Sequence, residues 1–202
     1  IYTVGPYLFP RLVPRIRELA PGMPMYIEES YTADLRGKLS SGALDAIFIA
    51  LPFTEPEVVT RSLFDEPFTV LLQKDHPLAR EQAIDPAALA EHRVLLMGEG
   101  HCFRDQVLEA CPGLQESIAA HNVRDHAVVE GSSLETLKHM VASGMGITVL
   151  PESAASVASY GDQELVLRPF TDPAPHRTIA LAWRVSYPRH QAIDVLAEAL
   201  KD

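Results

Sequence analysis

Cysteine is scarce in this sequence, which has only Cys102 and Cys111 among its 202 residues. So low a count argues against a disulfide-stabilised secreted domain and favours a reducing, cytoplasmic setting, in which the two thiols are inert, metal-binding or redox-active. Long apolar runs are also missing. AIFIALPF at 46–53 is one of the longest, and it is far shorter than the ~20 residues that a membrane-spanning helix needs. We therefore expect no association with a membrane.

Positive charge is the second shortage. The chain has 17 Lys and Arg against 27 Asp and Glu, a net charge of −10. Because contacts to phosphate need a basic patch, these residues are not expected to bind nucleic acid directly, although residues upstream could. The opening IYTVGPYL has no initiator Met and no basic region typical of a signal peptide. We therefore expect a fragment or a processed chain.

Several chemical motifs are lacking as well. The sequence has no glycine-rich phosphate loop of the Walker or dinucleotide type, no CxxC pair and no papain-like signature around Cys102. Eight histidines make a zinc site the obvious rival interpretation of the cysteines, but their spacing does not match structural zinc sites. The histidines considered are His101, His121, His126 and His139. We expect neither a metal nor a cofactor.

The sequence does contain alternating helix-like and strand-like segments. Apolar spacing and end signals predict helices over 5–20, 33–42, 101–111, 132–146 and 191–200, and a short helix after 151. Strand-like runs are 25–30, 44–51, 58–64, 68–73, 94–97, 127–131, 147–151, 164–170 and 177–184. This alternation predicts an α/β fold with a mostly parallel sheet. The length fits two similar α/β blocks with a ligand between them.

Polar residues follow several of the expected strands, where a helix is expected to begin. They are Thr3, Thr32, His101 with Cys102, and Ser132 with Ser133. In open α/β sheets such turns are common ligand sites, because helix N-termini and the carboxyl ends of strands meet there. Helix capping explains Ser and Thr at these places equally well, and Thr32 with Gly42 is the expected N-cap and C-cap pair of one helix.

The two cysteines lie at the two ends of HCFRDQVLEAC, residues 101–111. In one continuous helix, nine residues of rise separate them by ~13.5 Å on nearly opposite faces, whereas a disulfide needs Cα atoms within roughly 7 Å. The pair is therefore either without chemical meaning or dependent on a rearrangement. The eight residues between the cysteines would close easily into a loop if the helix unwound.

The surroundings of the two thiols differ. Cys102 falls in the first helical turn, where the helix dipole and unpaired N–H groups favour a thiolate, with His101 and Arg104 nearby and Asp105 on the same face. A small buried hydrophobic residue is the competing interpretation of Cys102. Cys111 precedes Pro112, at the end less favourable for a thiolate, and by itself it is expected to be buried.

Six segments of the chain resemble the regulatory domains of LysR-type bacterial transcription regulators. They are TVGPYLFP (3–10), SGALDAIFIAL (41–51), LFDEPF (63–68), GEGHCFRDQVLEAC (98–111), SSLETLKHMVASGMGITVLP (132–151) and RTIALAWR (177–184). Segments like SGALD and GMGITVLP are general to the family. GHCFRDQ with a second cysteine nine positions after the first is specific to its hydrogen-peroxide sensors.

The resemblance implies a periplasmic-binding-protein-like domain of two Rossmann-like subdomains. One would comprise residues 1–66 plus 172–202, and the other, with the cysteines, residues 67–171. It further implies a homodimer, a tetramer in the full-length protein, and promoter DNA bound by a winged helix-turn-helix outside this chain. RNA polymerase and cellular thiol reductants are the other implied partners.

The resemblance also assigns roles to individual residues. Cys102 would be oxidised by hydrogen peroxide to a sulfenic acid, and Cys111 would resolve it to a disulfide with local refolding. The expected peroxide ligands are Thr3, Thr32 and His101. The groups expected to stabilise the thiolate are Arg177, Arg104 and Asp105.

Two other functions use the same features. Most LysR-type relatives bind a small effector, and the cysteines would then be incidental. A thiol peroxidase would use the same chemistry of Cys102 in repeated turnover. A solute-binding protein is disfavoured by the missing signal sequence.

Overall fold

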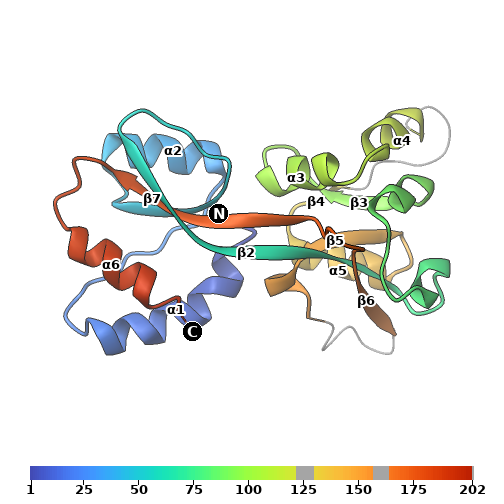
Figure 1. Cartoon of the computed structure of the whole chain (residues 1–202), viewed down its shortest axis with the longest axis horizontal. Coiled ribbons are helices and arrows are strands. Elements are labelled where there is room, and N and C mark those ends of the chain that lie inside the picture. The colour runs from blue at the N-terminus through green and yellow to red at the C-terminus, as the bar shows by residue number, and fades with distance from the viewer. Residues whose placement is uncertain (122–129, 157–163, 202) are drawn as a thin grey trace. The chain divides into compact units, whose positions relative to one another are not determined.

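The computed structural model describes residues 1–121, 130–156 and 164–201 (Figure 1). The chain forms two compact units, one of residues 1–65 with 178–202 and one of residues 66–177. The second unit thus includes Glu66 and residues 172–177, which the resemblance places in the first subdomain. Two strands, β2 (Val58–Gln73) and β7 (His176–Arg184), run from one unit into the other.

The first unit contains helices α1 (Gly5–Leu19), α2 (Thr32–Ser41) and α6 (His190–Glu198), and strand β1 (Ala46–Ala50). β1 pairs antiparallel with β7, so that Phe48 lies opposite Leu181. The apolar spacing that predicts α1 comprises Leu8, Leu12, Ile16 and Leu19. The first three are buried as expected, whereas Leu19, the last residue of α1, is 44% exposed. α1 packs beside α6 (Figure 1). Gly42 ends α2 with φ +82°, a left-handed conformation that glycine adopts without strain.

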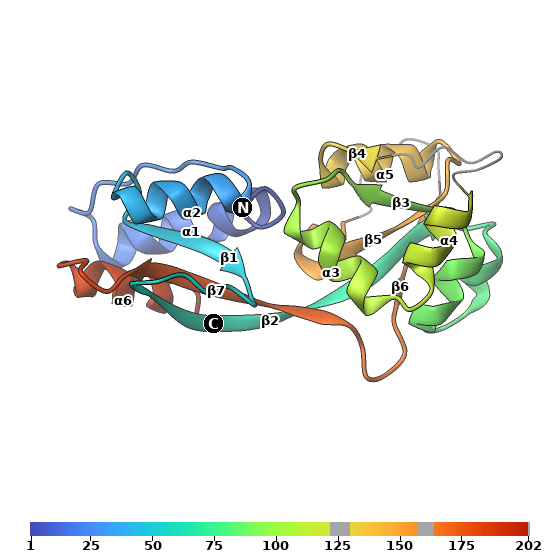
Figure 2. The same ribbon diagram turned by 90° about the horizontal axis from the view of Figure 1, so that it is seen from above.

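The second unit is built on a mixed sheet. β3 (Val94–Met97) runs parallel to β4 (Glu130–Gly131) and β5 (Ile147–Pro151), whereas β2 runs antiparallel to β5 and to β6 (Leu165–Pro169). Helix α3 (Cys102–Ala110) lies on one side of β3 and β5, and α5 (Leu134–Ala142) lies on the other (Figure 2). The remaining helices are α4 (Leu114–His121) and the 3-10 turns η1 (Pro77–Arg80), η2 (Pro86–Glu91) and η3 (Glu152–Ala154).

The expected mostly parallel sheet is wrong, because β1, β2, β5, β6 and β7 all take part in antiparallel pairs. The expected break between 58–64 and 68–73 is also wrong, since β2 is one strand. Asp65-Glu66-Pro67 resembles a turn in sequence, but tertiary contacts keep it extended. The N–H of Phe68 donates to the carbonyl of Pro175 at 2.9 Å, and the Thr178 hydroxyl donates to the Asp65 carboxylate at 2.6 Å.

Residues 25–30 alternate like a strand but form none, which contradicts the expectation. Alternation places side chains on two faces, but a strand also needs a neighbour for its backbone N–H and C=O groups. The segment instead borders a cavity beside β1, and Tyr26 is 81% exposed. Of the expected strand 127–131, only residues 130–131 are described, and residues 157–163 of the region after 151 lie outside the described chain.

No helix in the described ranges is long and apolar enough to cross a membrane.

Candidate redox site

Cys102 and Cys111 lie at the two ends of helix α3. Cys102 is the first helical residue and is half-buried, whereas Cys111 is the C-cap residue and is buried. Both are free thiols. The nine helical residues confirm the expected helix, which separates the two Cα atoms by about 13.5 Å along its axis. An intact α3 is therefore incompatible with a disulfide between them.

The start of α3 is placed by the end of β3. The N–H of Gly98 donates to the carbonyl of Gly131 at 3.1 Å, and Gly100 has φ +88°, which directs the chain into the helix. Because β3 is parallel to both β4 and β5, Cys102 lies at the edge where the carboxyl ends of these strands meet. Ligands of α/β sheets are commonly found there, and the helix N-terminus favours an anion such as a thiolate.

His101 precedes Cys102 as the N-cap residue of α3 and is only 6% exposed. Burial lowers the pKa of His101 below its usual value, because the charged imidazolium loses hydration there. The imidazole is therefore neutral near pH 7 and offers one donor nitrogen and one acceptor nitrogen. That is the form needed to accept a hydrogen bond or a proton beside Cys102.

Arg104 and Asp105, expected as polar partners of the thiolate, have different surroundings. Nη1 of Arg104 donates to the carbonyl of Met97 at 3.0 Å, which ties the first turn of α3 to the end of β3. Asp105 is exposed to solvent. A thiolate-stabilising role for either residue stays a prediction.

Cys111 is only 1% exposed, and burial raises the pKa of its thiol to about 11. At pH 7 about one molecule in ten thousand carries the thiolate at that pKa. The chain turns directly after it, since Pro112 is followed by Gly113 with φ +79°. In the folded helix Cys111 is therefore a protonated, enclosed thiol with little nucleophilic character.

Arg177 lies against α3, although sequence spacing alone gives no reason for it. Its guanidinium carbon is 5.1 Å from the ring centroid of Phe103, the residue after Cys102. Nε of Arg177 donates to Oε2 of Glu66 at 2.7 Å, and both side chains are buried, at 0% and 5% exposed. Oε1 of Glu66 accepts from the N–H of Ser153 at 3.1 Å. The expected role of Arg177 beside the thiolate stays a prediction.

Sequence reasoning missed Glu66 and Phe103. Glu66 and Arg177 are 111 residues apart, so no local spacing brings them together. The available signals were the position of Glu66 within LFDEPF and that of Phe103 within HCFRDQ, two of the segments that carry the family resemblance.

Thr3 and Thr32, the other expected peroxide ligands, belong to the first unit. Thr3 is buried and Thr32 is half-buried. The N-cap residues of α1 and α2 are Val4 and Tyr31, so neither threonine holds the N-cap position. The expected N-cap at Thr32 is wrong because Tyr31 has the extended backbone of a cap residue and its carbonyl already accepts the N–H of Leu35.

Ser133 behaves differently, and its capping interpretation is confirmed. It is the N-cap residue of α5, and its hydroxyl accepts from the N–H of Thr136 at 3.1 Å. Capping therefore accounts for the serine at this turn without a ligand.

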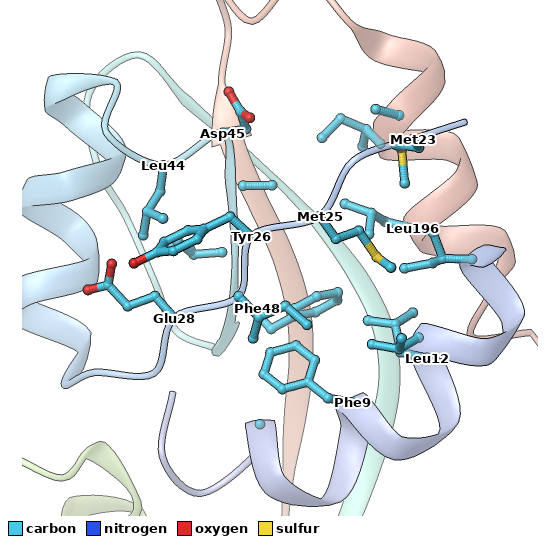
Figure 3. Close-up of a pocket in the computed structure, with 18 of the residues that line it drawn as sticks. Phe9, Leu12, Met23, Met25, Tyr26, Glu28, Leu44, Asp45, Phe48 and Leu196 are labelled. Carbon is cyan, nitrogen blue, oxygen red and sulfur yellow. The ribbon is translucent and has the colours of Figure 1, made fainter. Parts of the chain in front are cut away.

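A cavity of about 470 Å³ lies inside the first unit (Figure 3). Its wall is largely apolar, with Phe9 and Leu12 from α1, Phe48 from β1, Leu196 from α6, and Met25. None of the described residues that line it is a cysteine or a histidine. Because it lies within one unit, it is also not the cleft between two blocks that the small-effector hypothesis requires.

Metal-ligand clusters are absent from the described residues, which bring no three His, Cys, Asp or Glu side chains together in a suitable arrangement. Of the histidines considered for zinc, His126 and the side chain of His121 lie outside the described residues.

Comparison with known proteins decides the family. The family model of the LysR substrate binding domain matches residues 1–202. The chain belongs to this family. It is 37% identical over 201 residues to the DNA-binding transcriptional dual regulator OxyR of Escherichia coli strain K12, covering 100% of this chain and 63% of that regulator. The chain thus spans less than two thirds of that relative.

Solved structures agree with this placement. The reduced OxyR regulatory domain of Pseudomonas aeruginosa matches with a TM-score of 0.86 and 54% identity, covering 98% of this chain and 93% of that one. A hydrogen-peroxide-bound variant of Corynebacterium glutamicum OxyR matches with a TM-score of 0.82 and 28% identity, covering 98% of this chain and 61% of that one. The family model and the solved regulatory domain confirm the expected fold class. The similarity to OxyR proteins confirms the resemblance to the peroxide sensors of the family.

Proposed function

We propose that this chain is the hydrogen-peroxide-sensing regulatory domain of a LysR-type transcription regulator. The observation that carries the proposal is the placement of two free cysteines at opposite ends of α3, with Cys102 at the end that favours a thiolate. The hydrogen peroxide bound to the Corynebacterium glutamicum relative indicates hydrogen peroxide as the oxidant. The family membership supplies the regulatory context.

In the first step the Cys102 thiolate attacks one oxygen of hydrogen peroxide. A sulfur–oxygen bond forms, the oxygen–oxygen bond breaks, and the leaving hydroxide takes a proton to become water. The proton that Cys102 loses on forming its thiolate returns to the leaving hydroxide, and neutral, buried His101 is suited to accept that proton, pass it on and hydrogen-bond the peroxide. Thr3 and Thr32 are proposed as further peroxide ligands, and Arg177, Arg104 and Asp105 as groups that stabilise the thiolate, on the family resemblance.

In the second step the Cys111 sulfur bonds to the Cys102 sulfur. The sulfur–oxygen bond of the sulfenic acid breaks, and the departing hydroxide leaves as water with the proton from Cys111. Two barriers oppose this step in the folded helix, namely the separation of about 13.5 Å and a pKa of about 11 at Cys111. Unwinding α3 removes both, because it shortens the separation and lets water reach the thiol.

The refolded segment then acts as a covalently held switch. In the proposed full-length protein, this refolding changes the contacts between the two subunits of a homodimer within a tetramer. The altered tetramer then binds promoter DNA differently through its winged helix-turn-helix domains, which changes its contact with RNA polymerase. Cellular thiols reduce the disulfide and reset the switch in the cytoplasm. The domain is a sensor that reacts once per reset, and not a turnover enzyme.

Peroxide titration with thiol counting by mass spectrometry tests the proposal. We expect wild-type protein to lose two thiols per chain at low molar excess, with one disulfide between Cys102 and Cys111. Cys102→Ser should keep Cys111 free, and Cys111→Ser should stop at a sulfenic acid that dimedone traps. Two free thiols in the treated wild-type protein would rule out the sensor. Sustained peroxide consumption with a thiol reductant would identify a peroxidase instead.

A further inference from the structure

The side chain next to the reactive cysteine joins α3 to a buried ion pair. Phe103 is 1% exposed and lies between two groups from different strands. Its ring meets the ring of Phe68, on β2, edge to face with centroids 5.2 Å apart, and the guanidinium of Arg177, on β7, lies 5.1 Å from its centroid. We call Phe68, Phe103, Arg177 and Glu66 the Phe103 cluster.

The charged part of the cluster depends on being enclosed. Arg177 and Glu66 are 0% and 5% exposed, and a buried pair is tolerated only where hydrogen bonds and close packing replace the lost water. The N–H of Ser153 supplies one such bond to Glu66. The Phe103 ring supplies a face for the guanidinium, an interaction that strengthens when water is excluded.

The cluster opposes the motion that the second chemical step needs. Cys102 and Phe103 are adjacent in the first turn of α3, so unwinding that turn must move Phe103. Removing the ring breaks the contacts with Phe68 and with Arg177 and admits water to the ion pair. The packing of Phe103 thereby stabilises the folded helix. Phe103 is adjacent to the reactive Cys102, but this role does not require it to contact peroxide.

We propose that Phe103 is a positioning residue that sets the rate at which the Cys102 sulfenic acid is converted to the Cys102–Cys111 disulfide, by anchoring α3 to the Glu66–Arg177 pair. This inference rests on the proposed peroxide sensing. If so, the packing of Phe103 controls how long the Cys102 sulfenic acid persists before the disulfide forms. While the sulfenic acid persists, a cellular thiol can reduce it before the Cys102–Cys111 disulfide closes and α3 refolds.

The test compares Phe103→Leu with Phe53→Leu. Leucine keeps the apolar bulk at 103 but removes the aromatic face. Phe53 is a matched control, because its ring lies 5.4 Å from the guanidinium carbon of Arg36 and is 8% exposed, in the first unit. Quenched-flow mixing with peroxide, followed by dimedone trapping and mass spectrometry, gives separate rates for sulfenic acid formation and disulfide closure.

We expect Phe103→Leu to close the disulfide about five- to tenfold faster, as the loss of one aromatic pair and one cation–π contact implies. Sulfenic acid formation should change less than twofold, and Phe53→Leu should leave both rates within twofold of wild type. An unchanged closure rate in Phe103→Leu would overturn the inference. Equal changes in both rates would also overturn it, since they would show only general damage to the site.

A second measurement needs no peroxide and separates the two proposals. Hydrogen exchange of the α3 amides in reduced protein should be about five- to tenfold faster in Phe103→Leu than in wild type or Phe53→Leu. If wild-type protein forms no sulfenic acid, the proposed function fails, but faster exchange still supports the anchoring. If the sulfenic acid forms while exchange and closure are unchanged, only the role of Phe103 is overturned.

Discussion

Nε of Arg177 lies 2.7 Å from Oε2 of Glu66, and the two residues are separated by 111 positions in the sequence. β2 enters the second unit at Glu66, and β7 leaves it after Arg177. The pair therefore joins the two strands that run between the units, within the second unit itself. Because the Arg177 guanidinium lies against the Phe103 ring, the pair also supports α3, the helix that starts at Cys102.

Breaking this pair should be costly. Glu66→Gln removes the carboxylate charge that pairs with the buried Arg177 cation, so we expect the free energy of unfolding to fall by about 3–5 kcal/mol. Urea denaturation of reduced protein measures the change. Glu198→Gln is the control, because Glu198 pairs with Lys201 at the surface, where such a pair contributes little. Equal losses in the two variants would show that burial does not distinguish the pairs.

High pH should destabilise the reduced fold through Cys111. Burial raises its pKa to about 11, whereas in the unfolded chain the thiol loses its proton near pH 9. The unfolded state therefore holds fewer protons between pH 9 and 11, and stability falls as the pH rises through that window. The expected loss from this group is about 2 kcal/mol between pH 8 and 10.5.

Urea denaturation at the two pH values, in reductant, measures this loss. Cys111→Ala lacks the group and should lose less stability over the same interval by about that amount. An equal pH dependence in the two proteins would contradict the burial of the thiol.

Low pH should also destabilise the fold, in this case through His101. Burial lowers the pKa of His101, so below pH ~6.5 the His101 imidazole binds a proton more readily in the unfolded chain than in the folded chain. The His101 contribution to stability is full above pH ~6.5 and is lost as the pH falls toward the folded pKa. An NMR titration of the imidazole should give a midpoint lower in folded than in urea-unfolded protein. A midpoint that is equal or higher when folded would contradict it.

The Ser133 cap at the start of α5 should make a measurable contribution to stability. Ser133→Ala removes the acceptor for the N–H of Thr136, and we expect it to cost about 1 kcal/mol of unfolding free energy. Ser143→Ala is a matched control at the other end of the helix, where the hydroxyl donates to the carbonyl of His139. Thermal denaturation compares the two, and a larger loss in Ser143→Ala would rule out the cap as the stronger contact.

Local chemistry made part of the structure predictable. Pro112 and Gly113 end α3 as expected, because proline cannot continue a helix and Gly113 adopts a positive φ. The apolar spacing correctly placed Leu8, Leu12 and Ile16 of α1 in the core, although Leu19 at the end of the same spacing is exposed. The separation of the two thiols follows from helix geometry alone, which is why the need for refolding was visible before any coordinates.

Other features depend on partners far away in the chain. The alternation at 25–30 was misleading because a strand needs a neighbouring backbone, and Asp65-Glu66-Pro67 remains extended because Pro175 and Thr178 hold it. The sequence by itself determined the helix between Cys102 and Cys111, since backbone geometry and end signals act within a few residues. Only the tertiary structure decided that Phe103, Arg177 and Glu66 meet, and that burial lowers the pKa of His101. Pairing between residues far apart in the sequence is a property of the packed chain, and no local pattern encodes it.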